Sequence, residues 1–452
     1  MKIDLLIAEI GSTTTVVNAF NIKPCPRFVG QGQSATTVEE GNVNTGLKNA
    51  IKNLSKNLGV ENINYHELMA TSSAAGGLKM TVHGLVYDMT VKAAKEAALG
   101  AGANIKLITA GRLRECDLQK IKDMEPNIIL IAGGVDYGER KTALYNSKLI
   151  ANLGLNIPVI YAGNIESQDE IKDIFKYTNN ELYIADNVYP KIDQLNIEPT
   201  REIIQDVFEK HIINAEGMEK VKELIDGHII PTPGAVMKAS KILYKNMGNL
   251  LTIDIGGATT DIHSVSEDSD EVSRMLLHPE PIAKRSVEGD LGLYINIENI
   301  IEMVDKDMIL KRLNINLDEL NKLIDNCSPI PNTKEEIELI KLLAFYAGQI
   351  ALYRHVGTLK KIYGPTGKRT IAEGKDLTQV QYVIGTGGAL TRLPNSKLIL
   401  RDIISSPKDK YLLPNKEVNI LIDNDYIMAS LGVMSIKYPI EALVLMKKSL
   451  NF

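Results

Sequence analysis

The chain has 452 residues and a net charge of −5, with a pI near 5.9, and 44% of its residues are hydrophobic. This size allows two or three domains with sizeable cores. The acidic balance argues against a nucleic-acid partner, because such proteins usually carry a basic surface. Cys25, Cys116 and Cys327 lie far apart without CxxC spacing, which argues against disulfides, zinc and iron–sulfur clusters.

The amino terminus predicts a strand. MKIDLLIAEIGSTTT carries Asp4 and Glu9 in its apolar run, and it is too short and too charged for a signal peptide. No window approaches the roughly 18 consecutive apolar residues of a membrane helix. We expect a cytoplasmic protein with no membrane partner.

The first hundred residues predict alternating strands and helices. Residues 3–20 read as a hairpin, and a helix follows with apolar residues from Leu47 to Leu58, a cap at Asn44 or Thr45 and a stop at Gly59. After the strand and small-residue turn HELMATSSAAGG comes an alanine-rich helix, TVKAAKEAALGAGA.

Residues 105–213 form a regular series. IKLITAG, NIILIAGG, IPVIYAGN and ELYIADN are short apolar strands, each followed by an amphipathic segment. This alternation predicts right-handed βαβ units on a parallel sheet. We therefore expect an inserted doubly wound domain at 105–213, between a first lobe at 1–104 and a connecting helix with a second lobe at 214–452.

The remainder repeats the beginning. A helix leads into LLTIDIGGATTDIHSV, a second hairpin like the first. A long helical region is predicted from Leu291 to Leu359, followed by the strand and glycine turn QYVIGTGGAL and closing helices.

Three turns share one design: AEIGSTTTVV, IDIGGATTDI and VIGTGGALTRL. In each, a buried strand ends at glycine, which lets backbone amides approach a ligand, and hydroxyls add donors. Such turns can hold phosphate, and Asp254 can hold Mg²⁺ through its waters. A single Gly-Gly turn is more often a plain hairpin, so the paired hairpins carry the prediction.

Several residues keep a structural alternative. Asp261 can hold metal or nucleotide, or cap the turn through hydrogen bonds. The turn in NIILIAGGVDYG can contact a ligand or simply join a strand to a helix. His263 and His355 lie in apolar surroundings, which favours core packing for both.

The order of these motifs resembles the actin, Hsp70 and sugar kinase ATPase superfamily. ATSSAAGGLKM, KAAKEAALGAGA, LIAGGVDYG, PTPGAV, SVEGDLG and DNDYIMASLGVM resemble the glutamate mutase accessory family, of MutL or GlmL type. The resemblance covers essentially the whole chain, and AEIGSTTTVVNAF looks like the ornithine-degradation branch. It implies an α/β, two-lobed actin-like (ribonuclease H-like) fold with the inserted doubly wound βα domain.

The resemblance also implies site residues for ATP and Mg²⁺. Glu9, Asp254 and Asp261 are the candidate metal residues, and Asp254 and Glu9 are the catalytic candidates. The phosphate and adenosine turns are matched by Gly11, Ser12, Thr13, Thr14, Gly256, Gly257, Ala258, Thr259, Thr260, Gly385, Thr386, Gly387, Gly388 and Ala389. Glu9 stands where the superfamily usually has Asp, and Ile230 where chaperone ATPases tend to carry a carboxylate, which predicts slow hydrolysis.

The expected function is ATP-dependent reactivation of an adenosylcobalamin-dependent mutase, either ornithine aminomutase, which also uses pyridoxal phosphate, or glutamate mutase. Cobalamin contact and homo-oligomerisation are compatible with this expectation. Residues 105–213 are expected to face the partner; the alternative is a stabilising layer on the first lobe.

Three other functions stay open. A small-molecule kinase would need a carboxylate base, and the sequence does not point to one. The second is a structural or regulatory protein that binds nucleotide without useful turnover. The third, an ATPase that passes electrons to a dehydratase, would need cluster cysteines, and the scattered cysteines argue against it.

Overall fold

A computed structural model describes residues 1–11, 14–36, 43–73, 78–212, 225, 229–328, 331–364, 367–405 and 410–452. It separates into two compact units. The first contains Met1–Asn21, Val29–Ala235 and His278–Pro281, and the second contains Ile22–Phe28, Val236–Leu277 and Ile282–Phe452. Across these described ranges, we find no helix with both the length and the apolar character required for a membrane span.

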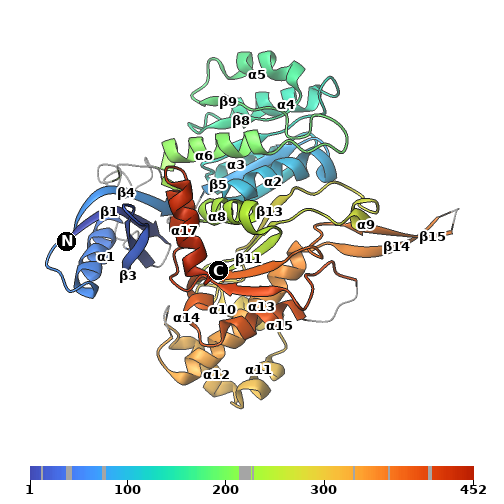
Figure 1. The fold of residues 1–452 in the computed structure, drawn as a ribbon. Helices are drawn as coiled ribbons and strands as arrows, with labels where there is room; N and C mark the ends of the chain where they lie inside the picture. The colour runs from blue at the N-terminus through green and yellow to red at the C-terminus, as the bar shows by residue number, and fades with distance from the viewer. Residues whose placement is uncertain are drawn as a thin grey trace. The chain divides into compact units, whose positions relative to one another are not determined.

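The first sheet, of which Figure 1 labels β1, β3 and β4, has the strand order β3-β2-β1-β4-β10. β1 and β2 are antiparallel and form the predicted first hairpin, whereas β4 runs parallel to both β1 and β10. α1 (Val43–Asn57) packs its apolar face on this sheet through Leu47, Ala50 and Leu54, as its spacing predicts. The strands are β1 (Lys2–Ile10), β2 (Thr14–Asn21), β3 (Arg27–Ala35), β4 (Asn64–Ser72) and β10 (Ile229–Pro231).

The second sheet has the order β13-β12-β11-β16-β17. β11 and β12 form the second predicted hairpin, β13 is antiparallel to β12, and β16 is parallel to both β11 and β17. Its strands are β11 (Leu250–Ile255), β12 (Thr260–Val265), β13 (Ala283–Glu288), β16 (Tyr382–Thr386) and β17 (Asn419–Ile422).

Both sheets thus place a hairpin beside a third strand on one side and two parallel strands on the other. This repeated order is that of the ribonuclease H-like, actin-type ATPase fold. The α/β fold class predicted from the sequence is therefore confirmed.

The third sheet lies in the first unit and has the order β6-β5-β7-β8-β9, with every pair parallel. Its strands are β5 (Leu78–Gly84), β6 (Ala103–Ala110), β7 (Ile128–Ile131), β8 (Val159–Tyr161) and β9 (Leu182–Ile184). Its helices are a π-helical turn (Tyr87–Val91), α2 (Lys92–Ala101), α3 (Glu115–Met124), α4 (Lys141–Ala151), a 3₁₀ turn (Ile165–Ser167), α5 (Gln168–Phe175) and α6 (Glu198–Ile212).

Helices cover both faces of this sheet. In β7, Ile128 and Leu130 pack with α2 and α6, while Ile129 and Ile131 pack with α3, α4 and α5. Because successive strand residues point to opposite faces, this division makes the sheet doubly wound. The sequence placed the start of this domain at residue 105, whereas the sheet begins with β5. β5 lies between β6 and β7, so the strands that reveal its membership come later in the chain.

Helices form most of the region predicted as helical from Leu291 to Leu359, and also the carboxy terminus, but the last helix of that region ends at His355 and Leu359 lies in a strand. α13 (Lys334–His355) lies in the main core cluster of this unit, and a β-ribbon of β14 (Thr358–Gly364) and β15 (Gly367–Glu373) follows it. The other helices are α8 (Thr232–Met247), which crosses from the first unit, α9 (Asp270–Ser273), α10 (Ile297–Met303), α11 (Lys306–Leu313), α12 (Leu317–Asp325), α14 (Gly387–Arg392), α15 (Ser396–Ser405), α16 (Met428–Met434) and α17 (Pro439–Ser449).

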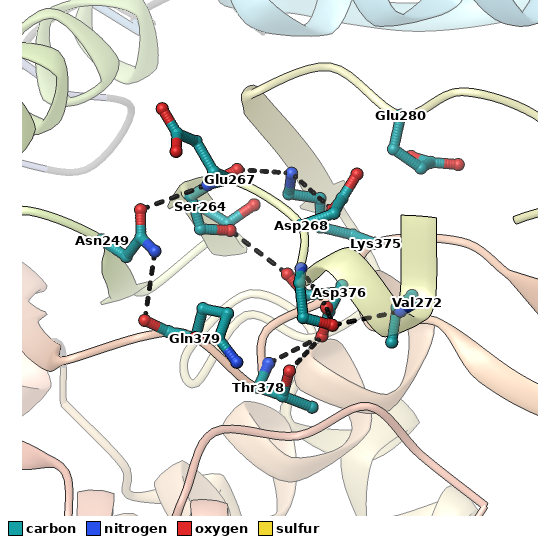
Figure 2. A network of polar contacts seen from close by, with 12 residues as sticks. Asn249, Ser264, Glu267, Asp268, Val272, Glu280, Lys375, Asp376, Thr378 and Gln379 are labelled. Atoms are coloured by element: carbon teal, nitrogen blue, oxygen red, sulfur yellow. Dashed lines mark hydrogen bonds and ion pairs between the residues drawn. The ribbon is translucent and has the colours of Figure 1, made fainter. Parts of the chain in front are cut away.

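A buried polar network anchors the second hairpin at the end away from its glycines (Figure 2). Lys375 is 1% exposed, and its Nζ donates to the carbonyl of Ser266 at 2.7 Å and contacts Asp268 Oδ1 at 3.3 Å. The Asp376 carboxylate accepts hydrogen bonds from the amide and hydroxyl of Ser269. These contacts join the segment after β12 to the segment before β16, so they help to fix the position of the hairpin.

Candidate functional site

Backbone hydrogen bonds fix the turn of the second hairpin, both within the hairpin and from the segment before α10. The amide of Gly256 donates to the carbonyl of Thr259 at 2.9 Å, and the carbonyls of Gly256 and Gly257 accept amides from Leu293 and Tyr294 at 3.2 and 2.9 Å. The segment before α10 therefore fixes the turn from outside the hairpin.

The glycine turn after β16 lies against this hairpin. Gly387 has φ +86°, and a Cβ there would meet Asp254 Oδ1 at 2.4 Å and the Ile255 carbonyl at 2.5 Å. Only glycine fits both the backbone conformation and the space. The turn thus approaches the carboxylate that the sequence singled out.

A cavity of about 250 Å³ lies between the two turns, within the second unit. The glycines of both turns form part of its wall, and apolar side chains form most of the rest. Its lining residues are Gly256, Gly257, Leu293, Tyr294, Ser328, Pro331, Ile337, Ile340, Gly388, Ala389, Arg392, Leu393 and Pro394. An apolar cavity bordered by glycine turns suits a flat heterocycle with an attached polar group.

Two carboxylates and a guanidinium share one face of the second sheet. Asp254 pairs directly with Asp261 across the hairpin, and Arg285 of β13 is 2% exposed with its Nη2 3.3 Å from Asp261 Oδ2. Burial raises the pKa of Asp261 above its ordinary value, and the Arg285 guanidinium opposes that shift. The arrangement is a buried ion pair beside a second carboxylate.

His263 lies on the same face, two residues after Asp261 and directly opposite Arg285. It is fully buried, which agrees with the expectation of a core histidine, and burial together with Arg285 lowers its pKa well below the usual value. The imidazole is therefore neutral. His355 is buried too, and hydrogen-bonded through both ring nitrogens to serine hydroxyls.

A divalent ion fits this group of side chains. One ligand atom from each of Asp254, Asp261 and His263 lies within 4.8 Å of the others. Asp261 Oδ1 and both ring nitrogens of His263 are buried without a hydrogen-bond partner in the described part of the chain. Uncompensated buried polar atoms are what a metal ion would satisfy.

The first hairpin, in the other unit, has a closing hydrogen bond at the matching positions. The Gly11 amide donates to the Thr14 carbonyl at 3.0 Å. Glu9 is 7% exposed and its Oε1 accepts from Asn18 Nδ2 at 3.2 Å. Ser12 and Thr13 lie outside the described residues. A metal role for Glu9 stays a prediction.

The hydroxyls of two predicted site residues form hydrogen bonds within the protein. Thr260 Oγ1 donates to the Leu291 carbonyl at 2.7 Å, and Thr386 Oγ1 donates to Asp423 Oδ2 at 3.0 Å. Ala258 is held through its carbonyl by the amide of Asn296 at 3.1 Å. Gly385 faces the core, since a Cβ there would meet Leu400 at 2.7 Å.

Sequence reasoning missed two residues of the site, Arg285 and Asp423. Arg285 sits in an unremarkable strand, AKRSVE, and nothing in that pattern marks it. Asp423 accepts Thr386 and also the amides of Ile427 and Met428, so it both caps α16 and holds the glycine turn. The SVEGDLG and DNDYIMASLGVM motifs were noted as part of the resemblance, and this was the available signal for Asp423 and for the segment over the turn.

The chain is similar to several known proteins. The profile of the MutL protein family matches residues 5–450. Protein MutL of Clostridium tetanomorphum is 35% identical over 457 residues, covering 98% of each chain.

Two solved structures are similar over most of the chain. Nucleotide-free acetone carboxylase has a TM-score of 0.38 at 10% identity, covering 96% of this chain and 70% of its own. The nucleotide-free diol dehydratase-reactivating factor has 0.37 at 11%, covering 96% and 99%. Both scores are below 0.5, so the fold assignment depends on the sheets themselves. The family profile and the full-length relative show that this chain belongs to the MutL protein family.

Proposed function

We propose that this chain binds Mg·ATP and uses it to reactivate an adenosylcobalamin-dependent mutase, with ornithine aminomutase as the first candidate and glutamate mutase as the second. The observation that carries nucleotide binding is the cavity between the turns at Gly256–Gly257 and Gly388–Ala389, with Asp254 beside them. Its apolar wall suits adenine, and its glycine backbone suits ribose and phosphate.

Membership of the MutL family supports the link to a mutase, through the resemblance of the same motifs to the glutamate mutase accessory proteins. Radical cobalamin enzymes inactivate when they lose the adenosyl group, and the damaged cobalamin stays bound until the site opens. An ATPase fold with two units can couple nucleotide state to such an opening.

Calorimetry tests the nucleotide site. Asp254→Ala should weaken Mg·ATP binding by about 1.5–3 kcal/mol, since a charged contact is lost. Asp325→Ala, at the exposed end of α12, is the matched control and should leave affinity unchanged. Equal affinity in the wild type and Asp254→Ala would remove the site assignment.

The mutase role is tested by recovery of activity from cobalamin-inactivated ornithine aminomutase, with and without ATP. Phosphate release by the protein alone should stay below about 1 per second, the low end of ordinary enzymes, because Ile230 is an apolar, buried residue at the expected carboxylate position. ATP consumption that depends on a small acceptor rather than on the mutase would favour the kinase alternative, although no carboxylate lines the cavity among the described residues.

The doubly wound domain is the proposed partner-facing part. It has its own apolar clusters on both faces of the sheet. Because the sheet starts at β5 and α6 packs on α2 (α6 ends at Ile212), the deletion should remove residues 78–212 and join the ends with a short Gly/Ser linker. Retained ATP binding with lost recovery supports the assignment, whereas retained recovery places the partner elsewhere.

A further inference from the structure

Three histidines are buried within the described residues, and they differ in one respect. His83, His263 and His355 are at most 1% exposed. Both ring nitrogens of His83 and of His355 lie 2.5–2.9 Å from hydroxyl oxygens. Those hydroxyls belong to Thr81, Thr109, Ser264 and Ser286. Neither ring nitrogen of His263 has a hydrogen-bond partner in the described chain.

A fully buried imidazole without partners is unfavourable, because its donor and its acceptor have both left water. The two other buried histidines show that this fold supplies hydroxyls where a histidine needs them. Around His263 the arrangement is different: one of its ring nitrogens, a carboxylate oxygen of Asp254 and one of Asp261 lie within 4.8 Å of one another, and Arg285 is its direct partner on β13.

The register of the sheet explains why these groups converge. Asp254 faces Asp261 across the hairpin, and Thr252 faces His263. Directly paired residues and residues two apart in a strand share a face. α8 packs over this face, where Ser240 Oγ lies 3.0 Å from Thr252 Oγ1. The three side chains therefore converge on one face of the hairpin, where Asp261 and His263 are buried and Asp254 is partly buried.

We propose that Asp254, Asp261 and His263 form a divalent-metal site in which the imidazole is a direct ligand. Ligand atoms around a small divalent ion lie about 3–4 Å apart, since each bond is roughly 2.0–2.2 Å long. The three ligand atoms, which lie within 4.8 Å of one another, would move closer together on binding the ion.

The donor set selects the class of metal. Mg²⁺ prefers oxygen ligands and keeps several waters, whereas a neutral imidazole with two carboxylates suits Mn²⁺, Fe²⁺, Co²⁺ or Zn²⁺. The site therefore favours a first-row transition metal over Mg²⁺. This inference deepens the proposed nucleotide site, on which it rests for its physiological role.

Charge links this site to a polyphosphate. With the ion pair to Arg285, the group of Asp254, Asp261 and Arg285 carries one net negative charge. A divalent ion leaves one net positive charge in a buried place, and phosphate oxygens bound at the adjacent turn would neutralise it. Metal and nucleotide should therefore each raise the affinity for the other.

The full-length protein, freed of metal by chelation, is titrated with Mn²⁺ alone and with Co²⁺ alone. Pulsed electron paramagnetic resonance of the Mn²⁺-loaded wild type should show coupling to an imidazole ¹⁴N, a measurement that needs no variant. Absence of that coupling, with Mn²⁺ bound elsewhere or not at all, overturns the proposal and leaves a buried water as the partner of His263.

The variant His263→Gln should raise the Mn²⁺ dissociation constant by at least the roughly 10- to 100-fold that loss of even an outer-shell partner causes, and it should abolish the ¹⁴N signal. His83→Gln, a buried histidine in the other unit, is the matched control and should change neither. Equal Mn²⁺ affinity in wild type and His263→Gln also overturns the proposal.

Binding of ATP with Mg²⁺ is measured on the same wild-type samples. ATP binding without imidazole-coupled Mn²⁺ removes this inference and leaves the proposed nucleotide site standing. Imidazole-coupled Mn²⁺ without ATP binding removes the proposed nucleotide site and leaves this inference standing.

Discussion

The two glycine hairpins share their strand pairing and a closing hydrogen bond, but they differ in the side chains at matched positions. Each turn closes with an amide-to-carbonyl bond of about the same length, from Gly11 to Thr14 and from Gly256 to Thr259. The register maps Glu9, Val16 and Asn18 of the first hairpin onto Asp254, Asp261 and His263 of the second, in the same order.

The side chains at matched positions behave differently. In the first hairpin an amide chain runs from Gln31 to Asn18 to Glu9, and the place of Asp261 is taken by buried Val16. In the second hairpin these positions carry two carboxylates and an imidazole, and Arg285 lies opposite the imidazole on β13. Hence the strand pairing and the closing hydrogen bond are repeated, whereas all three matched positions carry different side chains.

The correspondence extends to the neighbouring strands. Glu9 pairs with Thr71, whose Oγ1 accepts from Thr232 at 3.1 Å, and Asp254 pairs with Thr386, whose Oγ1 donates to Asp423 at 3.0 Å. In both sheets a threonine hydroxyl on the strand beside the hairpin is hydrogen-bonded to the residue that follows the outer strand, β10 or β17.

Removing the buried guanidinium of Arg285 should give the largest difference in stability between matched changes in the two hairpins. Arg285→Ala leaves Asp261 without its ion-pair partner in a buried place and should lower the free energy of unfolding by about 3–5 kcal/mol. Gln31→Ala, which removes the neutral partner of Asn18, is the matched change in the first hairpin and should cost about 0.5–1.5 kcal/mol. Urea and thermal unfolding measure both, and equal losses would contradict the difference in chemistry.

Asp423 and Thr232 form the second matched pair. Asp423→Ala leaves the amides of Ile427 and Met428 and two hydroxyls without their acceptor, so we expect a loss of about 2–4 kcal/mol. Thr232→Ala removes a single hydroxyl contact and should cost about 1 kcal/mol. Asp423→Ala should also weaken Mg·ATP binding in calorimetry, because Thr386 loses its anchor; unchanged affinity would show that the turn holds its shape without it.

Gly387 and Gly388 test how closely the third turn approaches the second hairpin. Gly387→Ala combines a positive φ with contacts of 2.4–2.7 Å to Asp254 and Ile255, and should cost about 2–3 kcal/mol. Gly388→Ala meets nothing within 4 Å and should leave stability nearly unchanged. A thermal melt of both variants checks this; similar melting temperatures would mean that the contact to Asp254 is not as close as described.

The smallest expected effect concerns the turns themselves. A Cβ at Gly11 would lie 2.7 Å from the Thr14 carbonyl, and a Cβ at Gly256 would lie 3.2 Å from the Thr259 carbonyl. Gly11→Ala should therefore cost about 1–2 kcal/mol and Gly256→Ala less than about 1 kcal/mol. Unfolding curves compare the two, and the reverse order would show that the first turn yields more easily than the second.

Much of the architecture was predictable from local pattern. The two hairpins, α1 with its stop at Gly59, and the parallel strands from β6 to β9 follow from apolar periodicity and glycine placement. The start of the doubly wound sheet was not, because β5 is recognised as one of its interior strands only when β6 and β7 pair on either side of it.

The candidate site divides in the same way. Asp254 and the glycines could be found from sequence, since a carboxylate and Gly-Gly at the end of a buried strand form a local signal. The roles of His263, Arg285 and Asp423 could not be predicted, because each depends on a partner on another strand or across a turn.

By itself, the sequence determined the strands, the turns and the repeated hairpin, because these depend on residues within a few positions of one another. Only the tertiary structure decided which side chains share a buried face. Strand register brought His263 beside two carboxylates, with no hydroxyl among the described residues bonded to its ring, and that register depends on long-range pairing that no local pattern encodes.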